Sequence, residues 1–264
     1  MGDDLVLENL FSEILADYFN TYGVNPFPIN ISIVDDMWDG YAKLRPDHAK
    51  KEPEMAEFQR TNNGTVVPPK KFEGTFTILL NKDYVIDSLQ KNTADWIGTL
   101  VHEAVHVNDF IQFAKLVKAT DYDIVLNRDK YRMFHLWTEF NAKAKGYYFV
   151  RKYTFKNVQD EGQLQYIFET ELPFQINNMF VAYHSTSDGD RQMYYVVHFI
   201  GRLYILQKLF PRYFTEEHIR ELFVSNMWMY ELYTFLTTHT ELEDANRYFN
   251  DMKEILKQNF SGLD

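Results

Sequence analysis

From Asp83 to the end of the sequence, apolar residues recur at the three- and four-residue spacing of an α-helix. This periodicity constrains the fold more than any other feature, because it leaves little room for strands in the second half of the chain. It predicts helices over residues 93–116, 128–153, 161–183, 188–209, 215–236 and 241–258. The same spacing predicts an opening helix over residues 5–22, which Gly23 would end.

Strand signals are confined to the first third of the chain. Residues 29–34 alternate isoleucine with other residues, and residues 75–80 combine high β-propensity with flanking turn signals. Between them, residues 35–72 are polar and rich in proline and turn residues, which indicates loops with little regular structure. We therefore predict an α+β fold, in a single domain over residues 1–264, with a short N-terminal β-sheet and a predominantly α-helical C-terminal half.

Composition excludes several classes of function. The chain has no cysteine, so disulfides, thiolate metal ligands and a cysteine nucleophile are all excluded. A net charge of -11 would repel a phosphate backbone, and no nucleic-acid partner is expected. The most apolar long stretch, residues 193–210, is interrupted by polar and charged residues, so no membrane span is predicted. Because the first residues are acidic and unlike a secretory signal, we expect a cytoplasmic location.

One short motif carries chemistry. His102-Glu103-Ala104-Val105-His106 lies inside an apolar helical run. Residues four apart share a helix face, so both imidazoles can bind one Zn2+ ion while Glu103 flanks them and reaches a water on that ion. Zinc lowers the pKa of such a water toward about 7, and a carboxylate can then act as general base. Two ordinary helix histidines are the alternative interpretation, but unpaired polar groups in an apolar helix are costly.

With this motif the sequence resembles the zincin superfamily of metallopeptidases. The metzincin branch is excluded, because Asp109 and Gln112 stand where that branch has glycine and histidine. Gluzincins instead take a third ligand from a glutamate on the next helix, and Glu139 in an aromatic segment resembles it. The resemblance spans residues 75–148 and implies a zincin-like fold. It also implies a zinc site of His102, His106 and Glu139, and an edge strand, here residues 75–80, along which a peptide substrate pairs.

The resemblance also suggests how the chain is organised. Residues 1–90 would hold the first helix, the small sheet and the loop, residues 91–153 the metal-binding helices, and residues 154–264 a helical subdomain. The alternatives for the third ligand are a surface role for Glu139, paired with Lys143, and His135 one turn earlier on the same face. Asp109 is a candidate for orienting an imidazole.

A catalytic donor for the oxyanion is predicted on the helix over residues 188–209. Arg191, Tyr195, His198 and Arg202 form a polar stripe on its otherwise apolar surface. We take His198 as the catalytic candidate, with Tyr195 or the Tyr183-His184 pair as alternatives. The other interpretation is that His198 is a core histidine bonded to its neighbours.

These residues together predict a zinc-dependent metallopeptidase that hydrolyses peptide or protein substrates, with Glu103 as general base. A carboxylate-bridged di-iron protein is a weak rival, because it needs a second Glu-x-x-His motif and the sequence has none. The stronger rival is a non-catalytic binding or sensing module that keeps the same architecture.

Overall fold

The structure is a computed structural model that describes residues 2–51, 53 and 55–260. Its contacts divide the chain into two compact units, an N-terminal unit (Met1–Asn127) and a C-terminal unit (Arg128–Asp264). The predicted α+β class is confirmed, since helices dominate and one small sheet is present. The single-domain organisation with internal boundaries near residues 90 and 153 stays a prediction.

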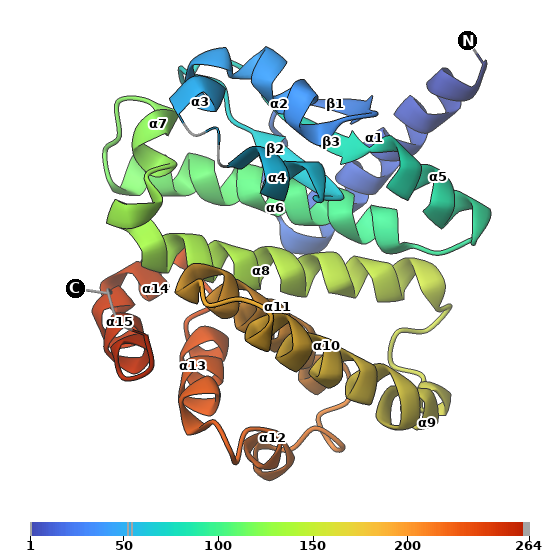
Figure 1. Cartoon of the computed structure of the whole chain (residues 1–264). Coiled ribbons are helices and arrows are strands. Elements are labelled where there is room, and N and C mark those ends of the chain that lie inside the picture. The colour runs from blue at the N-terminus through green and yellow to red at the C-terminus, as the bar shows by residue number, and fades with distance from the viewer. Residues whose placement is uncertain (1, 52, 54, 261–264) are drawn as a thin grey trace. The chain divides into compact units, whose positions relative to one another are not determined.

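The N-terminal unit contains the three described strands, and Figure 1 labels its elements. Its elements in chain order are α1 (Gly2–Tyr22), β1 (Ile29–Val34), α2 (Met37–Leu44), α3 (Pro46–Lys51), α4 (Met55–Arg60), β2 (Gly64–Val67), β3 (Phe76–Asn81), α5 (Lys82–Gln90), α6 (Asp95–Leu116) and α7 (Tyr122–Val125). The predicted first helix, both predicted strands and the helix over residues 93–116 are confirmed within one to three residues at their ends.

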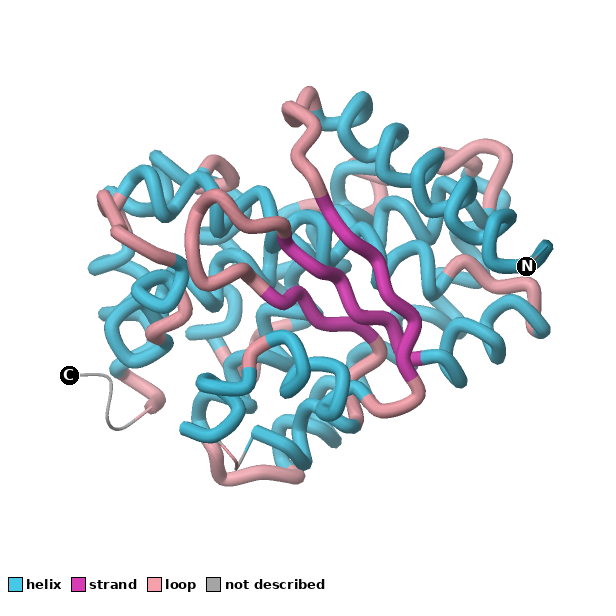
Figure 2. Tube along the Cα trace, turned by 90° about the horizontal axis from the view of Figure 1, so that it is seen from above, coloured by secondary structure: helices cyan, strands magenta, loops and turns pink. Residues whose placement is uncertain are grey.

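The sheet has the order β1-β3-β2, with β1 parallel and β2 antiparallel to β3 (Figure 2). All apolar side chains of β3 are buried, because the strand is covered on both faces. Leu79 packs with Met37 and Tyr41 of α2. Helix α6 contacts β2 and β3, and Figure 1 draws it on the side of the sheet opposite α2.

Two expectations about this unit are wrong. Residues 35–72 were expected to be loops, yet they contain three short helices and β2. Their polar and proline residues start helices: the Asp36 side chain accepts a hydrogen bond from the Asp39 amide at 2.9 Å, and Pro46 opens α3, where a missing N–H is harmless. The second error concerns the predicted substrate strand, because β3 is the central strand and both of its edges are already paired. The short strand β2 is an edge strand instead.

Within its described residues, the C-terminal unit contains helices joined by loops and no strand. Its elements are α8 (Arg128–Thr154), η1 (Glu161–Gln163), α9 (Leu164–Tyr166), η2 (Ile167–Glu171), α10 (Leu172–His184), α11 (Gly189–Leu209), α12 (Glu216–Leu222), α13 (Met227–Thr238), α14 (Leu242–Arg247) and α15 (Phe249–Lys257). The predicted helices over 128–153 and 188–209 are confirmed as α8 and α11. The prediction over residues 161–183 is confirmed, because η1, α9, η2 and α10 follow one another without a break from Glu161 to His184. The predictions over residues 215–236 and 241–258 are each broken into two shorter helices at turns that apolar spacing does not reveal.

A buried ion pair joins α8 to the segment that follows it. Arg151 is only 2% exposed, and its guanidinium lies 3.0 Å from a carboxylate oxygen of Glu171 at the end of η2. Arg151 also donates to Gln163 and to the Tyr147 hydroxyl, which itself donates to Glu171. Burial raises the pKa of Tyr147, so the hydroxyl keeps its proton as a donor. This network fixes the C-terminal end of α8.

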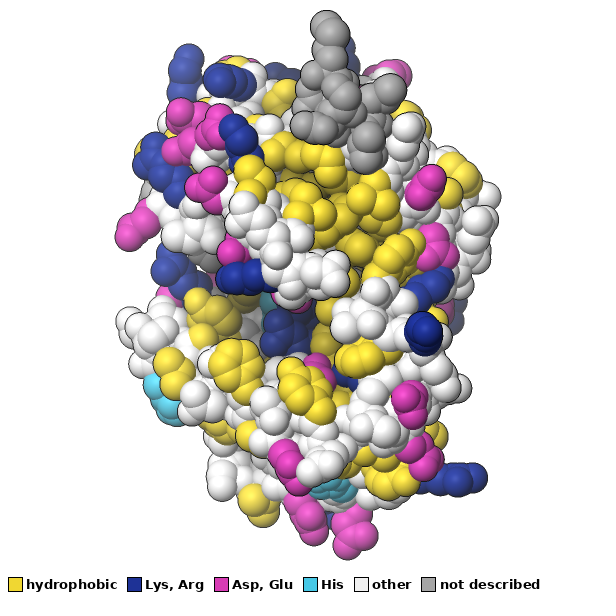
Figure 3. Space-filling model, turned by 90° about the vertical axis from the view of Figure 1, so that its right-hand side faces the viewer, with side chains coloured by type: hydrophobic (Ala, Val, Ile, Leu, Met, Phe, Trp, Pro, Cys, Tyr) yellow, Lys and Arg dark blue, Asp and Glu magenta, His cyan; other side chains and the backbone are white. Residues whose placement is uncertain are grey.

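The surface gives no clear functional signal by itself. On the face in Figure 3, acidic and basic side chains are scattered, and hydrophobic side chains gather mainly in the upper half. Large apolar side chains are exposed on separate helices, among them Leu89 on α5 and Phe174 on α10, which is ordinary for a folded protein. No described helix combines the length and the hydrophobicity that a bilayer crossing requires.

Helices α8 and α11 approach each other most closely at Gly201. A Cβ atom on Gly201 would lie 2.9 Å from the Phe140 carbonyl oxygen and 3.0 Å from the Ala144 backbone nitrogen. Both atoms belong to the α8 backbone and cannot move independently of that helix. Gly201 therefore sets the distance between the two helices.

We predict that Gly201→Ala destabilises the protein by about 1–3 kcal/mol, because the two helices must separate. The sign of the effect is the test, since glycine to alanine inside an ordinary helix stabilises by about 0.5–1 kcal/mol. Urea denaturation of both proteins gives the difference in free energy of unfolding. An unchanged or higher stability would show that the close approach at Gly201 is not required.

Candidate metal centre

Two imidazole nitrogens converge on one face of α6. His102 Nε2 and His106 Nε2 lie 3.0 Å apart, and the two rings are nearly perpendicular, at 83°. A tetrahedral zinc ion with Zn–N bonds of about 2.0–2.1 Å holds two nitrogens about 3.3 Å apart. The observed separation is that of a hydrogen bond between the two rings, and it is also close enough to this value for both histidines to bind one zinc ion.

The convergence follows from the helix and from the packing around it. His102 and His106 are four residues apart, which brings them to the same face. His106 is buried, and its ring stacks on Phe110 with a centroid distance of 5.8 Å. Since Phe110 is four residues further along α6, the stacking orients the imidazole from within the same helix.

Glu103 is buried beside the edge strand β2. Its relative exposure is 7%, which is low for a carboxylate. A Cβ atom on Gly64, the first residue of β2, would lie 3.2 Å from Glu103 Cγ and 2.5 Å from Thr99 Cγ2. The missing side chain of Gly64 therefore lets the strand backbone lie directly against the helix at Glu103. The Thr99 hydroxyl is also held, by a 3.1 Å hydrogen bond with the Tyr84 hydroxyl.

In the C-terminal unit, two further predicted site residues are bonded to each other. His198 Nε2 on α11 lies 2.9 Å from Glu139 Oε2 on α8, and both side chains are mostly buried. The His198 ring packs against Tyr194, with a centroid distance of 3.9 Å. The sequence assigned these residues to separate roles, as third ligand and oxyanion donor, whereas the structure makes them hydrogen-bond partners.

The remaining sequence candidates have other surroundings. His184 lies at the end of α10 in ring contact with Phe180 and Tyr183. His135 is half-buried on α8 and its ring contacts Phe134. Asp109 is buried on α6, and its charge adds to burial in raising the pKa of Tyr18.

Sequence reasoning missed two residues that shape these sites. Tyr194 is four residues before His198, so helical spacing could have identified it as a neighbour. Gly64 is 39 residues from Glu103 in the chain (103 − 64), and no sequence pattern reveals their contact. The structure thus brings together one pair within each unit, His102 with His106 and Glu139 with His198.

Comparisons with protein-family models, with curated proteins and with solved structures found no match to this chain.

We predict that Gly64→Ala destabilises the protein by about 1–3 kcal/mol and displaces Glu103, because the new Cβ overlaps Thr99 Cγ2. Thr99→Ser removes that methyl group and keeps the hydroxyl that bonds to Tyr84. In the Thr99→Ser background, Gly64→Ala should therefore cost at least about 0.5 kcal/mol less. Denaturation of the four proteins of this double-mutant cycle measures the coupling. Additive effects would refute the close contact.

Proposed function

We propose that this chain is a zinc-dependent peptidase with a zincin-like site of the gluzincin type. His102, His106 and Glu139 would be the zinc ligands, and Glu103 the general base. The observation that carries the proposal is the 3.0 Å separation of two Nε2 atoms on a helix that also buries Glu103.

The chemistry would be hydrolysis of a peptide bond. Bound zinc would lower the pKa of a water toward about 7 and polarise the substrate carbonyl. Glu103 would accept a proton from that water as its oxygen bonds to the carbonyl carbon. The carbon–nitrogen bond then breaks, and Glu103 delivers the proton to the departing nitrogen.

We propose that His198 positions Glu139. The 2.9 Å hydrogen bond would orient the carboxylate, as outer partners of metal ligands usually do. We therefore prefer the positioning role for His198 to a direct hydrogen bond with the oxyanion. The oxyanion role stays a prediction from the sequence. The two roles differ in outcome, because loss of a positioning residue lowers zinc affinity and loss of an oxyanion donor lowers only the rate.

An extended peptide would pair with β2. Among the described strands, β2 has one neighbour, β3, and its first residue lies against Glu103. Main-chain pairing with an edge strand tolerates many side chains. The proposed substrate strand is therefore residues 64–67. The strand expected from sequence was residues 75–80.

We predict that His102→Ala or His106→Ala lowers zinc affinity at least about a hundredfold, because each removes a ligand. Glu139→Ala should lower it about tenfold to a hundredfold, and His198→Ala about tenfold through lost positioning. Competition with a fluorescent chelator measures each affinity. His218→Ala, on α12 and outside both pairs, is the control and should bind zinc normally. Undiminished affinity in Glu139→Ala would reassign the third ligand.

We predict that Glu103→Gln keeps zinc but loses at least about 99% of peptide hydrolysis, because glutamine cannot accept the proton. The measurement compares products from a mixed peptide library for the wild type, Glu103→Gln and chelator-treated protein. Equal product formation in all three would contradict catalysis at this site. A zinc-bound protein without any hydrolysis would favour the binding or sensing module.

A further inference from the structure

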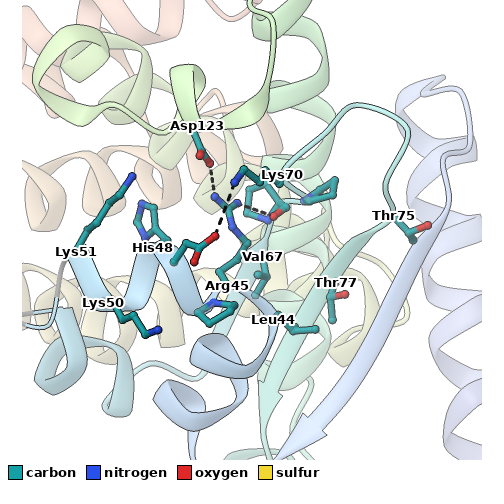
Figure 4. Close-up of a pocket in the computed structure, with 14 residues that line it drawn as sticks. Leu44, Arg45, His48, Lys50, Lys51, Val67, Lys70, Thr75, Thr77 and Asp123 are labelled. Carbon is teal, nitrogen blue, oxygen red and sulfur yellow. Dashed lines mark hydrogen bonds and ion pairs between the residues drawn. The ribbon is translucent and has the colours of Figure 1, made fainter.

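A cavity of about 600 Å³ lies in the N-terminal unit, at the end of β2 that is far from Glu103. Its walls come from α3, the C-terminal end of β2, the start of β3 and Asp123 of α7, as Figure 4 shows. Val67, the last residue of β2, and Thr77 of β3 form part of the lining. The cavity is therefore continuous with the edge strand that we propose as the substrate strand.

The described lining of this cavity is basic. It carries four lysine and arginine side chains and two aspartates, which gives +2 (4 − 2), in a chain whose net charge is -11. The basic residues are Arg45, Lys50, Lys51 and Lys70. A positive site in an acidic protein concentrates anionic ligands, because nearby cations offset the repulsion from the rest of the surface.

Arg45 holds the cavity walls together. It is 7% exposed, donates to the Pro68 carbonyl oxygen at 2.8 Å and forms an ion pair with Asp123. Lys70 lies 3.7 Å from Asp47 at the surface. Lys50 and Lys51 form no ion pair within the described residues, and both line the cavity from α3. These two lysines are therefore the groups that can bind an incoming anion.

The length of β2 connects this cavity to Glu103. Gly64 lies against Glu103, and Val67 lines the cavity. Three residue steps along a strand span about 10 Å. A peptide that pairs antiparallel with β2 runs from the cavity toward Glu103, so its N-terminal part would enter the cavity.

We propose that this basic cavity binds an acidic side chain of the substrate, about three to five residues on the N-terminal side of the cleaved bond. This inference rests on the proposed peptidase function and names its substrate class as acidic peptides. Lys50 and Lys51 supply the charge, while Arg45 keeps the cavity in shape. A carboxylate on a paired peptide is held twice, by the strand and by the lysines, whereas a free anion has only the lysines.

The first experiment sequences the products that the zinc-loaded protein releases from a mixed peptide library. Aspartate and glutamate should be enriched about three to five residues before the cleaved bond. In the Lys50→Gln/Lys51→Gln double variant, the enrichment should be about three- to tenfold lower, as expected when two exposed ion pairs are lost. Lys43→Gln/Lys115→Gln removes the same charge from exposed positions outside the cavity and should keep the enrichment. If the wild type cleaves the library, equal enrichment in all three proteins, or no enrichment in the wild type, overturns the proposal.

The second experiment does not require catalysis. Fluorescence anisotropy measures binding of a labelled peptide with a short run of glutamate, and of its glutamine counterpart, to zinc-loaded Glu103→Gln protein. The glutamate peptide should bind more tightly, and Lys50→Gln/Lys51→Gln in this background should remove the difference. If no protein cleaves any peptide but this difference is present, the peptidase function fails and the acidic-peptide site stands. Equal binding of both peptides, or inorganic phosphate binding as tightly as the glutamate peptide, overturns the site.

Discussion

The free-energy cost of burying polar groups on α6 is the constraint on which the rest depends. Glu103 and His106 are almost fully buried, and His102 is partly buried beside them. Such groups lose their hydration on folding and must regain partners inside the protein. The Nε2 atoms of the two histidines face each other at 3.0 Å, a separation that suits a shared cation. The proposed zinc site, general base and substrate strand all depend on this pair.

Glycines determine how closely other elements approach the two histidine-containing pairs. Gly64 brings the β2 backbone against Glu103, and Gly201 brings α11 against α8 next to Glu139 and His198. In each case a Cβ atom would lie within about 3 Å of its neighbours, so any other residue would push the elements apart. The polar side chains of each pair supply its chemistry. The nearby glycine determines how closely the neighbouring element packs against it.

Local patterns predicted the parts of the fold that depend on nearby residues. The spacing in α6, α8 and α11 revealed long helices, and the four-residue step predicted the convergence of His102 and His106. The prediction of loops over residues 35–72 is wrong because proline and aspartate occur both in loops and at helix starts. The capping hydrogen bond of Asp36 forms only once α2 is present. Glu139 and His198 were both identified, but their contact joins residues 59 apart and depends on helix packing.

The sequence of β3 itself indicates a central strand, which the expected substrate strand could not be. Residues 76–80 are five consecutive buried positions, and their near-continuous apolar run is typical of a central strand rather than an edge strand. An edge strand with one exposed side should be shorter and less apolar, as Gly64–Val67 is. With β2 as the edge strand, Gly64 lies against Glu103 at one end and Val67 lines the basic cavity at the other. In the proposed peptidase, hydrolysis would depend on the first end of this strand and substrate preference on the second.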